Sequence, residues 1–203
     1  MTYTVKPELI ANVLENEYAG LPNELLTAHI GLLKGYCKNL NGLLTEIPTI
    51  SGQHLADRRR RLGFESRGYF NHLYYFEQLK VDGVAPTDDF KRMLEEQAET
   101  SFDKLIADVT TAGTTRGVGW IVVVMCPVTH KLSTVWVSSH EDAIPHGEAI
   151  FFVDMWEHAY LISGAYAPSE KGAYIQAYLN HVDWTVVQKR MEDVLAGRKV
   201  VPM

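Results

Sequence analysis

Residues 154–160 read Asp-Met-Trp-Glu-His-Ala-Tyr and combine side chains that could hold a metal ion. Asp154 directly follows the apolar run at 149–153, which predicts a carboxylate at the end of a buried strand. An unpaired buried charge is very costly, so Asp154 needs a partner, and a metal ion is one. If the chain turns helical after Asp154, His158 lies one turn later and can reach the same ion.

Carboxylate plus imidazole is a ligand set that suits iron, manganese or zinc. Cys37 and Cys126 are isolated in the sequence, which argues against a structural zinc site and favours free thiols in a reducing compartment. A second interpretation stays open, in which Asp154 caps a helix and His158 packs in the interior.

Two further histidines lie in apolar, aromatic-rich surroundings. His29 belongs to a stripe of leucines spaced by three and four, and His72 is embedded in Tyr-Phe-Asn-His-Leu-Tyr-Tyr-Phe at 69–76. Tyr36 follows His29 by seven residues, about 700° of helix rotation, so the two share a helix face. This spacing is common in helices and is weak evidence by itself.

The elements that must position these residues follow from periodicity and turn signals. Residues 1–92 read as helical, with a break at 47–52 and a turn-rich segment at 81–89 that predicts a boundary. The second half mixes helices and β-branched runs. We expect helices at 88–105, 170–180 and 184–196, a hairpin of strands at 120–125 and 132–137, and a third strand at 149–154.

Bulk properties exclude several classes of function. The net charge of −6 argues against a nucleic-acid partner, and the basic run Arg58–Arg61 reads as a solvated helix face. The first eight residues lack the apolar region of a signal peptide, and the apolar run Trp120–Met125 is too short to span a bilayer. We therefore expect a cytoplasmic protein with no membrane partner.

Five segments, in order along nearly the whole chain, resemble motifs of the iron/manganese superoxide dismutases. The segment at 154–160 is similar to the family signature D-x-W-E-H-A-Y-Y. The others are Y-C-K-N-L-N at 36–41, N-H-L-Y-Y-F at 71–76, G-V-G-W at 117–120 and A-Y-I-Q-A-Y-L-N-H-V-D-W at 173–184. One motif could arise by chance, but five in family order identify the chain as a member.

The resemblance implies an α+β fold with two domains. A helical hairpin domain would cover 1–87, and a C-terminal domain with a three-stranded antiparallel sheet and surrounding helices would cover 88–203. It implies an enzyme that converts superoxide to dioxygen and hydrogen peroxide by cycling a single Fe or Mn ion per subunit. The implied metal ligands, two from each domain, are His29, His72, Asp154 and His158, with solvent as the fifth.

The resemblance also implies roles around the metal. Tyr36 would be a gate residue near the solvent ligand, and Trp120 and Trp156, with Phe76, would form an apolar wall. A histidine after the second strand would hydrogen-bond the solvent ligand; we choose His140, with His146 as the alternative. Glu157 would bond a ligand histidine of a neighbouring subunit, which predicts a homodimer, or a tetramer, built through the Glu157/His158 region.

The chain departs from the family pattern in ways that bear on function. His29 and Tyr36 are seven residues apart where the common pattern has eight, so an ungapped alignment places Ala28 at the ligand position. Leu32 and Leu161 replace a polar pair that usually links subunits, and Lys171 replaces an arginine near the substrate entrance. Two alternatives remain: a metal-dependent oxidase of another substrate on the same scaffold, and an inactive metal-binding homologue. The sequence does not choose between iron and manganese.

Overall fold

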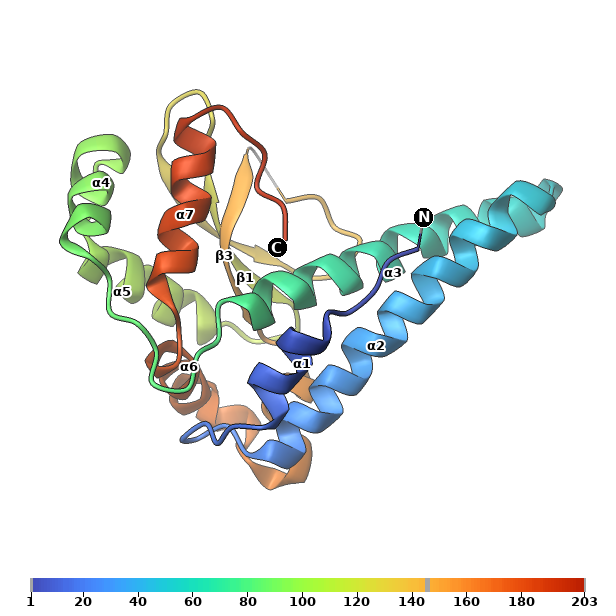
Figure 1. Cartoon of the computed structure of the whole chain (residues 1–203), viewed down its shortest axis with the longest axis horizontal. Coiled ribbons are helices and arrows are strands. Elements are labelled where there is room, and N and C mark those ends of the chain that lie inside the picture. The colour runs from blue at the N-terminus through green and yellow to red at the C-terminus, as the bar shows by residue number, and fades with distance from the viewer. Residues whose placement is uncertain (1, 145–146, 203) are drawn as a thin grey trace.

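The computed structural model describes residues 2–144 and 147–202. Its first half is helical, as predicted: a short α1 (Pro7–Leu14) is followed by α2 (Asn23–Glu46) and α3 (Gly52–Glu77). The two long helices run side by side and project from the rest of the molecule as an arm (Figure 1). Between them, the predicted break is a single 3-10 turn at Ile47–Thr49.

The described part of the second half contains four more α-helices and a sheet. The helices are α4 (Asp88–Ala98), α5 (Phe102–Gly113), α6 (Lys171–Asn180) and α7 (Trp184–Leu195). The prediction of one helix over 88–105 is wrong, because the chain breaks after Ala98. Glu99 adopts a left-handed conformation, with φ of 54°, and Ser101 starts α5 by accepting a hydrogen bond from the Lys104 amide.

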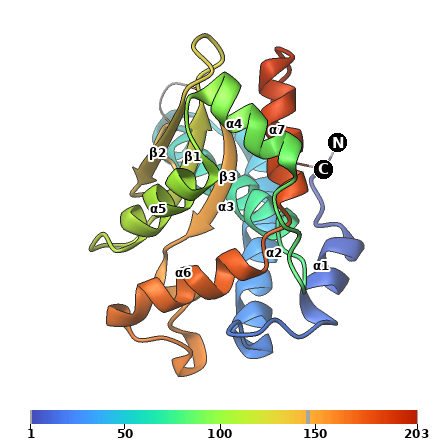
Figure 2. The same cartoon turned by 90° about the vertical axis from the view of Figure 1, so that its left-hand side faces the viewer.

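The sheet has three antiparallel strands in the order β2-β1-β3 (Figure 2). They are β1 (Trp120–Met125), β2 (Leu132–Val137) and β3 (Glu148–Asp154), close to the predicted bounds. The central strand is buried throughout, which explains its unbroken apolar sequence. In the register of β1 and β3, Trp120 lies opposite Asp154, so both side chains reach the same end of the sheet.

The inner end of α3 packs against β3 and joins the two halves of the chain. The rings of Tyr74 and Phe152 stack with centroids 4.8 Å apart. Gln78, just past the helix, donates to the Phe152 carbonyl and accepts from its amide, at 2.6 and 3.3 Å. Arg190 of α7 donates to the Gln78 side chain from the other side. These buried bonds fix the position of α3 relative to the strand that carries Asp154.

The α+β fold class, with its helical N-terminal part and three-stranded sheet, is confirmed. The division into domains at 87/88 stays a prediction. Over 2–144 and 147–202, every helix is too short or too polar to cross a bilayer. His146, the alternative to His140, lies outside the described residues.

Candidate metal centre

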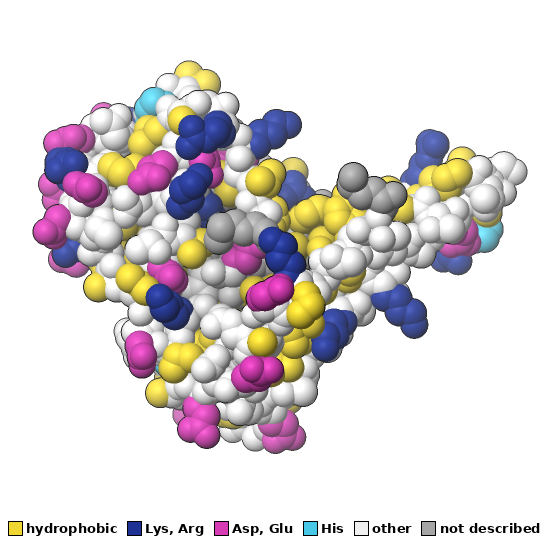
Figure 3. Space-filling model, viewed as in Figure 1, with side chains coloured by type: hydrophobic (Ala, Val, Ile, Leu, Met, Phe, Trp, Pro, Cys, Tyr) yellow, Lys and Arg dark blue, Asp and Glu magenta, His cyan; other side chains and the backbone are white. Residues whose placement is uncertain are grey.

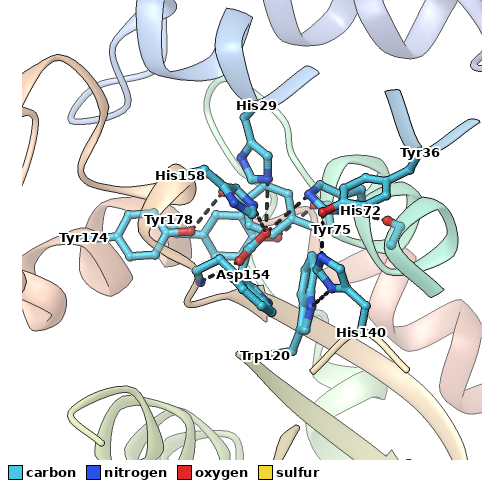
Figure 4. A network of polar contacts seen from close by, with 12 residues as sticks. His29, Tyr36, His72, Tyr75, Trp120, His140, Asp154, His158, Tyr174 and Tyr178 are labelled. Atoms are coloured by element: carbon cyan, nitrogen blue, oxygen red, sulfur yellow. Dashed lines mark hydrogen bonds and ion pairs between the residues drawn. The ribbon is translucent and has the colours of Figure 1, made fainter. Parts of the chain in front are cut away.

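Four elements bring the four predicted metal ligands together (Figure 4). His29 comes from α2, His72 from α3, and Asp154 is the last residue of β3. His158 lies in a 3-10 turn at Glu157–Ala159 that follows β3. One ligand atom from each of the four lies within 4.8 Å of the others.

The three imidazoles converge on a single carboxylate oxygen. Nε2 of His29 and Nε2 of His158 each lie 3.1 Å from Oδ2 of Asp154, and Nε2 of His72 lies 3.5 Å from it. The other oxygen, Oδ1, accepts a hydrogen bond from the Trp156 amide at 2.8 Å, which fixes the carboxylate plane. Asp154, His29 and His72 have no exposed surface, while the side chain of His158 is 18% exposed.

The protonation state of His72 provides a test of whether these residues fit a metal ion. Nδ1 of His72 lies 2.5 Å from the Gly68 carbonyl oxygen, so Nδ1 carries the proton and donates it. In the neutral ring, Nε2 then carries a bare lone pair, and it has no hydrogen-bond partner among residues 2–144 and 147–202. It faces the carboxylate of Asp154 at 3.5 Å, so two electron-rich atoms meet in a buried site. A cation between them turns this repulsion into coordination, so the residues fit a metal.

The pKa directions agree with a ligand set of one anion and neutral imidazoles. Burial lowers the pKa of His29, and burial together with the neighbouring His29 lowers the pKa of His72 well below its ordinary value. Burial alone would raise the pKa of Asp154, but the surrounding histidines hold it below its usual range. The carboxylate is therefore ionised, and the buried rings carry no charge.

The spacing of His29 and Tyr36 is accommodated without distortion. Helix α2 is a regular α-helix from Asn23 to Glu46, so the seven-residue interval places both side chains on one face. Ala28, the competing position in an ungapped alignment, is half-buried and has no ligand atom. The structure therefore brings His29 into the cluster.

Hydrogen bonds through His140 connect Tyr36, the predicted gate residue, to Trp120 at the start of β1. Nε1 of Trp120 donates to Nδ1 of His140 at 2.9 Å, and Nε2 of His140 lies 2.8 Å from the hydroxyl of Tyr36. Because an indole N–H can only donate, Nδ1 of His140 is an acceptor and the ring proton is on Nε2. Nε2 then donates to the Tyr36 oxygen, which leaves the tyrosine proton free to donate elsewhere. Burial lowers the pKa of His140 to about 4, which keeps this ring neutral.

Aromatic side chains surround the cluster. Phe76 and Tyr75 contact His29, with ring centroids 4.8 and 5.0 Å apart, and Trp120 contacts His72 at 5.0 Å. Trp156 lies 4.8 Å from the ring of His140. Trp156 is partly exposed, whereas the other three rings are buried, so Trp156 forms the outer edge of this wall.

Other predicted residues lie outside the cluster. Glu157 is exposed on the surface, and its predicted contact with a second subunit stays a prediction. Lys171 is 8% exposed, lines a surface pocket with Glu157 and Tyr160, and donates to the carbonyls of Thr115 and Gly117 at 3.2 and 2.6 Å. Sequence reasoning missed Phe64, whose ring lies 4.8 Å from His140. The sequence offered one indication of this role: Phe64 lies about two helix turns before His72, on the same helix.

Gly68 makes room for the gate tyrosine, and this leads to a prediction. A Cβ at Gly68 would lie 2.5 Å from Cδ1 of Tyr36, so alanine must displace the ring. We expect Gly68→Ala to lower the free energy of unfolding by about 1–3 kcal/mol and to weaken the bond between Tyr36 and His140. Chemical denaturation and the dismutation rate of metal-loaded protein would measure the two effects.

Gly42 in α2 is the matched control, because nothing lies within 4 Å of a Cβ placed there. Glycine is costly inside a helix, so Gly42→Ala should raise the free energy of unfolding by about 0.5–1 kcal/mol. Equal stabilisation by both substitutions would contradict the packing described for Tyr36.

Comparison with known proteins places this fold and cluster in a family. A family profile described as iron/manganese superoxide dismutases, C-terminal domain, matches residues 86–190. A superoxide dismutase named for manganese from Mycolicibacterium fortuitum is 30% identical over 184 residues, which cover 87% of this chain and 86% of the relative. One named for iron from Methanothermobacter thermautotrophicus is 30% identical over 141 residues, 67% of each chain. One named for both metals from Aeropyrum pernix is 29% identical over 173 residues, 81% of this chain and 79% of the relative.

The chain belongs to the iron/manganese superoxide dismutase family. The relatives are named for iron, for manganese or for both, so the comparison leaves the choice of metal open.

Proposed function

We propose that this protein is a superoxide dismutase that holds one Fe or Mn ion per subunit through His29, His72, Asp154 and His158. The observation that carries the proposal is the bare Nε2 of His72 facing the Asp154 carboxylate in a fully buried cluster. The reaction consumes two superoxide anions and two protons and yields dioxygen and hydrogen peroxide. Membership of the family supports this activity.

The bound ion would supply the one-electron change that lets one superoxide be oxidised and the next reduced. The side chains of the protein supply the charge balance, the exclusion of water and a proton donor. Asp154 provides a negative charge to balance a cation, and burial keeps the imidazoles of His29 and His72 uncharged. The aromatic wall excludes bulk water, and Tyr36, oriented by His140 and Trp120, has a hydroxyl proton available to the substrate.

Burial of the centre supports a small substrate over a larger organic one. Three of the four proposed ligands have no exposed surface, and the fourth is 18% exposed. A diatomic anion can approach such a site through partly exposed side chains, whereas an organic molecule would need a cavity at the ligands. We further propose a homodimer, or a tetramer, in the cytoplasm, with the Glu157 and His158 region at the subunit contact.

His140 is proposed to position Tyr36 and not to bind the metal, which gives a prediction. His140→Ala should leave metal content unchanged but lower the dismutation rate about 10–100-fold, the usual cost of losing an outer partner, and change its pH dependence. Metal analysis and stopped-flow decay of superoxide on the same samples would measure both. Loss of the metal in this variant would contradict the assignment.

The proposed function itself is tested by preparing the metal-free protein and reconstituting it separately with Fe and with Mn. Superoxide decay should be accelerated by at least one of the two forms and not by the metal-free protein. Oxidation of organic substrates by a form that does not dismutate superoxide would favour the alternative enzyme on the same scaffold.

A further inference from the structure

One face of the candidate centre is covered by two partly exposed aromatic side chains. The ring of Tyr36 lies 5.1 Å from that of His72, and the ring of Phe64 lies 4.8 Å from that of His140. The rings of Tyr36 and Phe64 are 6.0 Å apart. A small anion that approaches from this side passes these two rings before it reaches the buried histidines.

An ion pair lies against Phe64, one of the two rings of this aromatic cover. The guanidinium carbon of Arg61 lies 4.7 Å from the centre of the Phe64 ring, and the arginine side chain is 50% exposed. Nη2 of Arg61 lies 2.6 Å from Oε1 of Glu65, whose side chain is only 1% exposed. The other carboxylate oxygen of Glu65 accepts from Asn39 at 3.1 Å. The pair therefore has a buried negative end and an exposed positive end.

The exposed positive end of this pair lies close to the gate residue, because Phe64 contacts both Arg61 and Tyr36, at 4.7 and 6.0 Å. The distances from Arg61 to Phe64 and from Phe64 to His140, 4.7 and 4.8 Å, keep the guanidinium within about one Debye length, ~10 Å at 0.1 M salt, of His140. Salt therefore does not fully screen this charge from an anion at Tyr36.

We propose that Arg61 is the cation that receives the anionic substrate at this face, and that buried Glu65 opposes it and anchors its position. The proposal rests on the proposed function, because it requires an anionic substrate. Lys171 does not take this role at this face, since its ammonium group donates to two backbone carbonyls beside a different pocket, which Glu157 and Tyr160 also line. Other Lys and Arg side chains stand along the arm formed by α2 and α3 (Figure 3), but the ring contact places Arg61 at the aromatic cover.

Substitution of the two partners should have opposite effects on an anion. Arg61→Gln leaves the Glu65 carboxylate uncompensated, so the second-order rate constant for superoxide should fall about two- to fivefold at low salt. Glu65→Gln removes the negative charge but keeps one amide oxygen that can accept from Arg61, and it should raise the rate constant by a similar factor. The double variant should return close to the wild-type value, and all differences should shrink at high salt.

Arg60→Gln is the matched control, because it removes the same charge from a neighbouring, exposed position on α3. It should change the rate constant much less than Arg61→Gln does. A purely structural role for the ion pair would make both Arg61→Gln and Glu65→Gln slower, and an effect of net charge alone would make the two arginine variants equal. Either result overturns the proposal.

A second readout needs neither the metal nor turnover. Iodide, an anion, and acrylamide, a neutral molecule, both quench exposed tryptophan fluorescence, and Trp156 is partly exposed 4.8 Å from His140. Trp136 is also partly exposed, so it is replaced by Phe and the quenching then reports on Trp156. In this metal-free background, the ratio of iodide to acrylamide quenching should fall in Arg61→Gln and rise in Glu65→Gln, by about 1.5-fold at low salt. If the wild type does not dismutate superoxide, the proposed function fails and this ratio still tests Arg61. Unchanged or same-direction ratios would overturn the role of Arg61 even in an active enzyme.

Discussion

Replacing His72 by alanine should strip the protein of its metal. His72 is fully buried, and its Nε2 has no partner other than the proposed ion, so nothing in the remaining cluster substitutes for it. We expect the affinity for Fe or Mn to fall by more than about 100-fold, beyond the 10–100-fold cost of losing an outer hydrogen-bond partner. Dismutation should fall with it. Metal analysis after dialysis, with superoxide decay on the same sample, measures the effect.

Two further variants make this result interpretable. His54→Ala changes the same residue type on the same helix, but the side chain is 54% exposed and pairs only with Glu46, so metal content should not change. Alanine at His72 also leaves a cavity in the core, which costs about 2–5 kcal/mol. His72→Leu fills most of that space without a ligand atom. Retention of metal by a folded His72→Leu protein would show that His72 is not a ligand.

Asp154→Asn should have two effects. Metal binding should be lost, because Asp154 is the anionic group among the four proposed ligands. The metal-free variant should also be less stable than metal-free wild type by about 1–3 kcal/mol, because an amide does not replace the charged acceptor whose contacts with His29 and His158 hold the pKa of Asp154 below its usual range. Its side-chain NH2 can donate to the bare Nε2 of His72, which offsets part of this loss. Denaturation of both proteins in the presence of chelator measures this difference.

Glu148→Gln is the matched control on the same strand. Glu148 lies at the opposite end of β3, where it accepts from the Val200 amide, so its substitution should leave metal content unchanged. Retention of full metal content by a folded Asp154→Asn protein would show that the carboxylate is not a ligand. That outcome would favour the interpretation of Asp154 as a structural residue.

The sequence predicted the residues of the site better than their surroundings. Hydrophobic periodicity placed the strands and long helices, and the resemblance supplied all four residues that the structure brings together. The hydrophobic pattern did not predict that the helix ends before Glu99. The amphipathic pattern of 88–105 continues across this residue, although its backbone is in the left-handed conformation. Local pattern carries no information about such a backbone reversal.

The features of the site that the sequence did not predict depend on contacts between residues far apart in the sequence or on helix geometry. The role of Phe64 depends on the packing of α3 against the loop that carries His140, and these segments are far apart in the sequence. Lys171 was expected near a substrate entrance, yet its stem folds inward to two carbonyls, which charge and position in the sequence cannot reveal. The lone pair on His72 follows from one backbone contact, with Gly68, that only the helix geometry shows.

The central claim is that these four side chains hold one redox-active Fe or Mn ion that dismutates superoxide. The most direct test measures metal content and the rate of superoxide decay on the same samples of protein, reconstituted separately with Fe and with Mn. The account predicts about one equivalent of metal per subunit and catalytic decay of superoxide by at least one form. Full occupancy with negligible dismutation by both forms would contradict it.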